Sequence, residues 1–172
     1  FLGFKSEKKL TIASEVLCIE SDAYDSYELL KKDFTETFAE FIKVFGEIEI
    51  NFLGLRYINN IEIAEDGPLE WGKYIHSKLL LKFTKHKKSL SRVFQILEYN
   101  FGDYNLRYQF GMHNPDYPAP IRRKLFTLDI DTYYSGLIEL AEISTGLDKF
   151  HKHTQTLFEE SITDDLRGFM HG

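Results

Sequence analysis

The segment from Asn51 to Ile63 is the longest part of this chain whose side chains alternate with the two-residue period of a β-strand. Arg56 lies in the middle of this segment with core-type residues on both sides, and Asn59 and Asn60 follow it. A guanidinium among core residues needs a partner, because an unpaired charge away from water is very costly. The segment therefore predicts a central strand of a sheet and a polar site built around Arg56.

A long amphipathic helix is predicted from about Ser26 to Phe45. Asp25 followed three residues later by Glu28 resembles a capping box, and Gly46 suits the end of the helix. The apolar side chains recur at steps of three and four residues and so share one face. They are Tyr27, Leu30, Phe34, Phe38, Phe41, Ile42 and Phe45. A face this rich in phenylalanine favours packing against a sheet.

The other segments predict a mixed fold. Short β-branched runs near the N-terminus indicate strands, and Phe1 to Phe4 is expected to close an earlier strand. Trp71 to Leu81 has the spacing of a shorter helix. A hairpin is predicted at residues 92–112, with its turn at Gly102-Asp103, and a further strand at residues 121–133. The C-terminal part reads as helical. We therefore predict a single α+β domain over residues 1–172, with a mainly antiparallel twisted sheet packed by the long Phe-rich helix and a C-terminal helical segment.

The length, net charge and cysteine content restrict the partners and the cellular location that we expect for this chain. It has 172 residues, enough for a substantial core, and a formal net charge of −6, which argues against a general nucleic-acid binder. Its single cysteine, Cys18, cannot form an internal disulfide, and no apolar run approaches the roughly 18 residues of a membrane span. We therefore expect a cytoplasmic protein with no membrane partner. Because the sequence begins with Phe1, we also expect it to be the larger, C-terminal part of a longer chain.

The predicted partners of Arg56 are two acids on a neighbouring strand, Asp129 and Asp131. We hypothesise that Arg56 pairs with one of them across the sheet. A pair that fixes the register of the strands is the simpler interpretation, and a ligand site is the alternative. The candidate polar site consists of Arg56, Asn59, Asn60, Asp129, Asp131 and His151.

Asp129 and Asp131 also raise the question of a metal. Two acids at alternate strand positions share one face, as a metal site would need, but a third ligand would have to come from His151 or Glu159. In the simpler alternative, Asp131 ends the strand and caps the following helix. We expect no metal and no cofactor.

Two basic segments could meet phosphates. The first holds Lys82, Lys85, His86, Lys87, Lys88 and Arg92, and the second holds Arg122, Arg123 and Lys124. If the segments converge, they would form a surface facing RNA or DNA. If they do not, each is a solvated connector, which the acidic net charge favours. The candidate phosphate-facing residues are Lys85, Lys87, Lys88, Arg92, Arg122 and Arg123.

Several short strings resemble a family of uncharacterised, sporadically distributed prokaryotic proteins. They are Gly54-Leu55-Arg56-Tyr57-Ile58-Asn59, Trp71 to Ile75, Leu128-Asp129-Ile130-Asp131 before Tyr133, His151 with Phe158, and Ile162 to Arg167. The resemblance covers nearly the whole chain in order, and members of the family are longer at the N-terminus. The family has no established activity. Its patchy occurrence implies a place in a mobile-element or phage-defence system.

Three functions follow as hypotheses. The chain has no Walker loop, dinucleotide glycine motif, Gly-x-Ser-x-Gly or zinc spacing, so the common enzyme chemistries have no support. We expect a non-enzymatic interaction module that binds a protein partner or self-associates through an exposed sheet edge or an aromatic face. The alternatives are a nucleic-acid-binding or metal-dependent nuclease-like component, and a small-ligand binder with a pocket between the sheet and the long helix.

Overall fold

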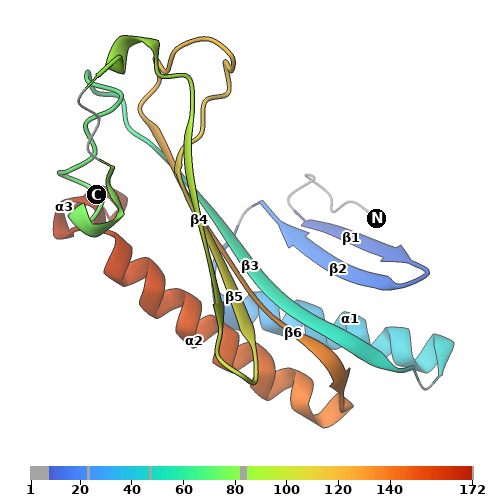
Figure 1. Ribbon diagram of the computed structural model, residues 1–172. Coiled ribbons are helices and arrows are strands. Elements are labelled where there is room, and N and C mark those ends of the chain that lie inside the picture. Colours follow the sequence, from blue (N-terminus) through green and yellow to red (C-terminus); the bar gives the residue numbers. More distant parts are fainter. Residues whose placement is uncertain (1–7, 23, 47, 82–84, 172) are drawn as a thin grey trace. The chain divides into compact units, whose positions relative to one another are not determined.

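The computed structural model describes residues 8–22, 24–46, 48–81 and 85–171 (Figure 1). The contacts between residues divide the chain into two compact units. The smaller unit contains residues 1–51 and 136–148, and the larger unit contains residues 52–135 and 149–172. Helices and antiparallel sheets occur together, so the α+β prediction is confirmed. None of the helices in the described part of the chain combines the length and apolar character needed to span a bilayer.

The smaller unit pairs two short strands and places a helix against them. Strands β1 (Lys8–Ala13) and β2 (Val16–Ser21) form an antiparallel hairpin, as predicted, and helix α1 (Tyr27–Phe45) contacts β2. The helix is capped by Ser26, whose hydroxyl accepts a hydrogen bond from the backbone N–H of Leu29 at 3.2 Å. The prediction that Asp25 caps this helix is therefore wrong by one residue. A strand expected at residues 1–4 lies outside the described residues.

Helix α1 is also joined to the segment that opens α2 (Ile143–Ser161). The Tyr27 hydroxyl donates to Asp148 at 2.7 Å, and the Lys31 ammonium reaches the same carboxylate at 2.7 Å. The 3₁₀ turn η3 (Leu140–Glu142) precedes α2 within this unit. The smaller unit is thus held by one hairpin and by polar contacts between two helices.

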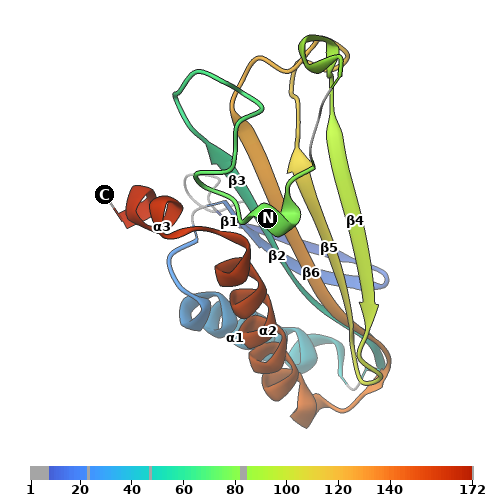
Figure 2. The ribbon, with the colours of Figure 1, turned by 60° about the vertical axis from the view of Figure 1, so that its left-hand side comes forward.

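The larger unit is built on a four-stranded sheet with the order β3-β6-β5-β4. The strands are β3 (Ile50–Glu62), β4 (Val93–Asn100), β5 (Asn105–Met112) and β6 (Leu125–Ile138). β4 and β5 form the predicted antiparallel hairpin, and β5 is also antiparallel to β6. β3 and β4 are the edge strands of this sheet. Figure 2 shows the helix α2 running along one face of the strands.

The core of the larger unit lies between the sheet and α2. Leu106, Leu128 and Ile130 are almost fully buried, since they point to the covered face. Hydrogen bonds between hydroxyl groups also fix the helix to the sheet. The Tyr108 hydroxyl donates to Ser161 Oγ at 2.7 Å, and the hydroxyls of Thr132 and Thr154 lie 3.1 Å apart. The helix seen on this sheet is therefore the predicted C-terminal one, whereas the Phe-rich α1 packs on β2 in the smaller unit.

The shorter helix predicted from Trp71 to Leu81 does not form. The segment consists of turns and one 3₁₀ turn, η1 (Ser77–Leu79). Its backbone bonds elsewhere, because His76 N donates to Ser161 O at 2.9 Å and Thr163 N donates to Tyr74 O at 3.0 Å. Trp71 and Tyr74 are nonetheless buried in the core. Tertiary hydrogen bonds at the junction of α2 and α3 (Asp164–His171) have replaced those of a helix.

Candidate functional site

A row of polar side chains crosses the sheet of the larger unit on the face opposite to α2. Asp129 and Asp131 alternate along β6 with the buried Leu128 and Ile130, so they point to this second face. Across the ladder, β5 places Gln109 opposite Asp129 and Arg107 opposite Asp131. Arg56 joins the row from β3. The alternation of side chains along the strands therefore brings these five side chains together on one face of the sheet.

Arg56 and Asp129 form the strongest contact in this row. The guanidinium donates from Nε to Oδ1 at 2.8 Å and from the second terminal nitrogen to Oδ2 at 2.7 Å. The hydrogen bonds to Asp129 raise the pKa of Arg56. The predicted pairing is confirmed, but the guanidinium is not buried, because 54% of the Arg56 side chain is exposed against 10% for Asp129. The nearly buried Asp129 carboxylate therefore needs this pair more than the exposed guanidinium does.

Asp131 lies one step further along the same face. Burial raises the pKa of its carboxyl, and the nearby Arg56 opposes that rise. Arg107 faces Asp131 across the ladder and also approaches Glu98 of β4, with its Nε 3.8 Å from the carboxylate. The alternative in which Asp131 ends its strand and caps a helix is wrong, since β6 continues to Ile138.

The space between these side chains is very small. Arg56, Arg107, Gln109, Asp129 and Asp131 line a hollow of about 10 Å³. That volume is at the lower limit for one water molecule, so the row does not accommodate an organic ligand. Over residues 8–22, 24–46, 48–81 and 85–171, no three His, Cys, Asp or Glu side chains are grouped so that they could hold a metal ion. The geometry suits an ion pair that fixes the strands.

The other predicted site residues serve different contacts. Asn59 Nδ2 donates to Leu128 O at 3.2 Å, and Thr127 Oγ1 donates to Asn60 Oδ1 at 2.8 Å, so both amides join β3 to β6. His151 belongs to α2, and its Nδ1 lies 3.2 Å from the Tyr57 hydroxyl. Since α2 covers the opposite face of the sheet, His151 is separated from Arg56 and Asp129.

The sequence did not predict another polar contact of α2, at His153. Its imidazole is half-buried, and its Nδ1 lies 2.5 Å from the hydroxyl of Tyr104. The rings of Phe101 and Tyr104 surround the imidazole at centroid distances of 4.8 and 5.6 Å. Burial lowers the pKa of His153. Arg107 and Gln109 were not predicted as site residues either, although in the sequence they alternate with the apolar Leu106, Tyr108 and Phe110 and so share one face of a strand.

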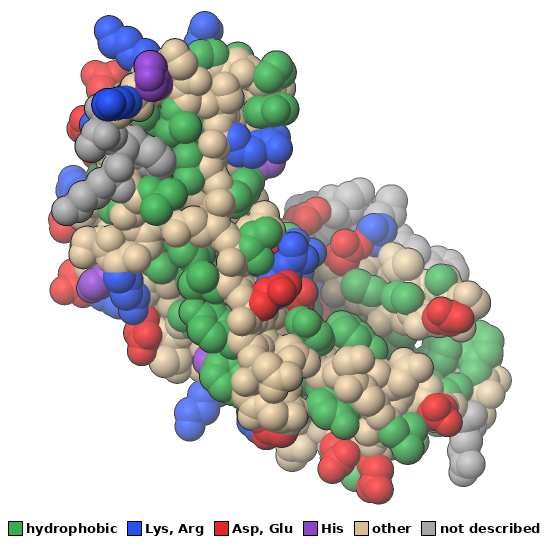
Figure 3. All heavy atoms as spheres, in the orientation of Figure 1, with side chains coloured by type: hydrophobic (Ala, Val, Ile, Leu, Met, Phe, Trp, Pro, Cys, Tyr) green, Lys and Arg blue, Asp and Glu red, His purple; other side chains and the backbone are tan. Residues whose placement is uncertain are grey.

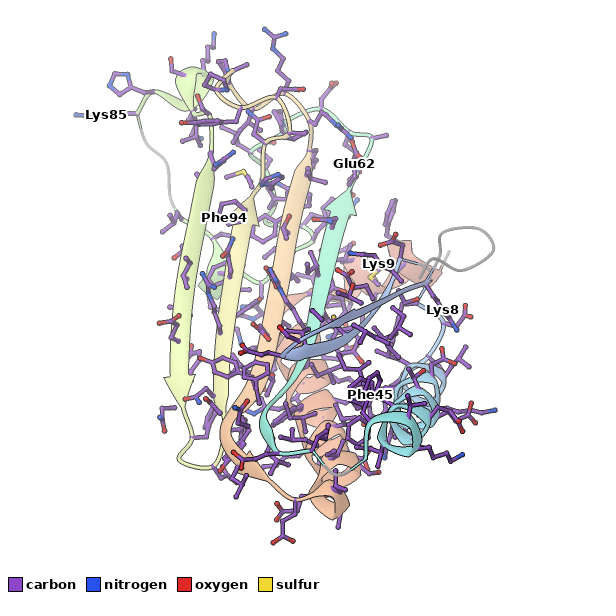
Figure 4. All side chains as sticks on the ribbon, turned by 90° about the vertical axis from the view of Figure 1, so that its right-hand side faces the viewer. Lys8, Lys9, Phe45, Glu62, Lys85 and Phe94 are labelled. Carbon is purple, nitrogen blue, oxygen red and sulfur yellow. The ribbon has the colours of Figure 1, made fainter. Side chains whose placement is uncertain are left out.

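The two basic segments converge at one end of this sheet. Ile121 N donates to Leu90 O at 2.8 Å, which joins the start of the second segment to the end of the first. Figure 3 shows Lys and Arg side chains, with a few Asp and Glu side chains beside them, at the upper end of the larger unit, and Figure 4 labels Lys85 at that end. Lys124 does not contribute, because it is buried and its ammonium lies 3.0 Å from Glu65. Lys82 lies outside the described residues.

An apolar cavity of about 70 Å³ lies in the same unit. Its walls include Trp71, Leu80, Val93, Met112 and Phe126. Pockets for drug-sized ligands measure roughly 300–1,000 Å³, so this one accommodates only a few atoms. The proposed pocket between the sheet and the Phe-rich helix would join two different units and stays a prediction.

The edge strand β4 exposes much of its length. Every residue from Ile96 to Asn100 is exposed, including Leu97 and Tyr99. In the described part of the chain, β5 is its neighbour on one side and no strand pairs with its other side. As far as the described residues show, this edge of the sheet is unpaired and carries apolar side chains.

Comparisons with known proteins do not extend these observations. No family model, curated protein or solved structure matches the chain. The resemblance to a family of uncharacterised prokaryotic proteins, and the mobile-element or phage-defence role that it implies, therefore stay predictions.

Proposed function

We propose that this chain is a non-enzymatic interaction module whose binding surface is the free edge of β4. The observation that supports this function is the exposed run from Ile96 to Asn100 on an edge strand. An edge strand with free N–H and C=O groups is a template for another strand. The partner proposed first is a second copy of the chain, because like edges can pair about a two-fold axis.

The protections that usually blunt a sheet edge are scarce along β4. Natural edges carry lysines, prolines, bulges or inward-pointing charges that prevent pairing. β4 is eight residues long, with the sequence Val-Phe-Gln-Ile-Leu-Glu-Tyr-Asn, and Glu98 is its only charged residue. Half of the surface of residue Ile96 is exposed, and Leu97 and Tyr99 are exposed on the opposite face of the strand. A second strand would cover apolar surface on both faces.

The hairpin defines which backbone groups of β4 are free. Phe101 N donates to Tyr104 O at 2.9 Å, so residue 101 points its backbone groups toward β5. Hydrogen-bonded and non-hydrogen-bonded positions alternate along an antiparallel pair. Odd-numbered residues of β4 therefore bond to β5, and the free N–H and C=O groups belong to Phe94, Ile96, Glu98 and Asn100.

These free groups allow an antiparallel pair of two copies with Ile96 on the two-fold axis. In this register Ile96 faces Ile96 of the second copy, and Leu97 faces Gln95. Glu98 faces Phe94 of the second copy, so no like charges oppose one another. The two four-stranded sheets would become one continuous sheet of eight strands, with Glu98 still near Arg107 of its own chain.

Sedimentation velocity over a range of concentrations tests this function. We expect the wild type to shift from monomer to dimer as its concentration rises. Glu98→Pro removes an outward N–H while keeping the bonds to β5, so it should weaken the dimer about tenfold or more. Glu98→Ala is the matched control, because it removes the side chain and keeps the N–H. A wild type that stays monomeric throughout, or a Glu98→Pro variant that associates as the wild type does, would contradict the proposal.

A further inference from the structure

The loops that carry the two basic segments are fixed to each other. Asn114 is buried, and its Nδ2 donates to Ser91 O at 3.0 Å and to Ala119 O at 2.6 Å. Its Oδ1 accepts from Asp116 N at 3.1 Å. Together with the bond between Ile121 N and Leu90 O, this amide holds the loop before β6 against the segment before β4. The basic side chains therefore project from a preorganised base.

This end of the sheet concentrates positive charge in an acidic chain. Residues 85–92 and 113–123 contain six Lys or Arg and one acid, Asp116, whereas the whole chain has a net charge of −6. All six of these cations are exposed: Lys85, Lys87, Lys88, Arg92, Arg122 and Arg123. Arg123 is engaged with Glu62 at 2.7 Å. Five exposed cations remain around the fixed loops, and they would attract a polyanion although the protein as a whole repels one.

An aromatic platform lies among these cations. The guanidinium of Arg92 lies over the ring of Tyr117, 4.1 Å from its centroid, and 55% of the Tyr117 residue surface is exposed. A second ring pair is formed by Phe94, two residues after Arg92, and His113, four residues before Tyr117. Their ring centroids lie 5.7 Å apart. Stacked arginine and aromatic planes bind unstacked bases, and neighbouring lysines contact the phosphates.

We propose that this end of the larger unit binds single-stranded nucleic acid. A base stacks on the Arg92–Tyr117 pair, and the backbone phosphates contact Lys87, Lys88 and Arg122. A single strand fits better than a duplex, because a base can stack on the Arg92–Tyr117 pair only when it is not already stacked between its neighbouring bases. The site lies on loops next to η2 (Lys87–Ser89), so it does not depend on the pairing of β4.

Fluorescence anisotropy with a labelled single-stranded oligonucleotide of mixed sequence tests the site. The triple variant Lys87→Gln, Lys88→Gln, Arg122→Gln should bind at least tenfold more weakly than the wild type. The control is Lys32→Gln, Lys43→Gln, Lys152→Gln, which removes the same charge from exposed positions on helices and should bind as the wild type does. Circular dichroism melts confirm that both variants fold.

Two further readouts separate stacking from charge alone. Tyr117→Ala should weaken binding by about tenfold, and Tyr117→Phe should retain it, because the ring and not the hydroxyl stacks. The slope of log affinity against log salt should be about −2 for three phosphate contacts on a single strand, and should approach zero in the triple variant.

Several results would overturn the proposal. Absence of oligonucleotide binding, or equal losses in the triple variant and its control, would exclude this surface. Duplex of the same sequence bound as tightly as the single strand would exclude the stacking. Vesicles of phosphatidylglycerol and phosphatidylcholine, or poly-glutamate, bound as tightly as the oligonucleotide would show a general anion surface instead.

Discussion

Arg56 and Asp129 hold β3 to β6 through two parallel hydrogen bonds, at 2.8 and 2.7 Å. Arg56→Ala would leave a nearly buried carboxylate without its donors. Hydrogen bonds to charged groups contribute about 1.5–3 kcal/mol, and the exposure of the guanidinium places the expected loss near the lower end. Urea unfolding measures it. Arg56→Lys should lose part of this stability, because an ammonium cannot make both bonds.

The control for this prediction is the double variant Arg56→Ala, Asp129→Asn. Removing the charge left behind should recover some of the stability lost in Arg56→Ala. If the single variant unfolds at the same urea concentration as the wild type, the pair does not stabilise the sheet.

Asp131 should be the carboxyl whose titration lowers stability as pH rises. Because burial raises its pKa above the ordinary value of 3.8, the folded protein binds more protons than the unfolded chain between these two pKa values. Stability due to this group is therefore greatest below that window and falls as pH rises through it. Asp131→Asn should remove this dependence. Carboxyl carbon NMR titration checks the pKa, and a midpoint at or below 3.8 would contradict the prediction.

His153 should act in the opposite direction. Burial lowers its pKa below the ordinary 6.5, so its neutral form, which can accept from Tyr104, is favoured in the folded state. Its stabilising contribution is present above pH 6.5 and is lost as pH falls through the lowered pKa. Proton NMR of the imidazole in the wild type gives the midpoint. Tyr104→Phe removes the hydroxyl, and we expect it to lower stability at pH 7 by about 1 kcal/mol. An imidazole that titrates at 6.5 or above would show that the ring is solvated.

Gly111 should not tolerate a side chain. It has a φ of +149°, and a Cβ at this position would lie 2.1 Å from the carbonyl oxygen of Val93. Gly111→Ala should therefore separate β4 from β5 and cost about 1–3 kcal/mol in unfolding measurements. Gly72→Ala is the matched control, since its Cβ would meet no atom within 4 Å. Equal stability of the two variants would argue against this close approach.

The sequence predicted those features that depend on local period. Alternation along residues 51–63 and 121–133 placed Arg56 and Asp129 on one face of neighbouring strands, and their charges then made the pair predictable. The hairpin was predicted from another local signal, the turn residues Gly102 and Asp103. Helix α1 was found from its spacing, with an error of one residue at the cap because Asp25 and Ser26 are both good capping residues.

Features that depend on contacts between distant segments could not be predicted. Trp71 to Leu81 has a helical spacing, yet its backbone bonds to residues about 90 positions later in the sequence. His153 has an unremarkable position on its helix, and only the arrival of Tyr104 from the hairpin makes it a half-buried acceptor. The two basic segments meet because Asn114 and Ile121 bond to Ser91 and Leu90, which no local pattern indicates.

Residue-resolved hydrogen exchange at low and high protein concentration tests the central claim most directly. Pairing of β4 predicts that the amides of Phe94, Ile96 and Glu98 exchange quickly in dilute solution and become protected as concentration rises. Leu97 and Tyr99, which bond to β5, should be protected at both concentrations and serve as internal controls. Fast exchange at Phe94, Ile96 and Glu98 at every concentration, with Leu97 and Tyr99 protected, would show that the edge of β4 stays unpaired and would contradict self-association through it.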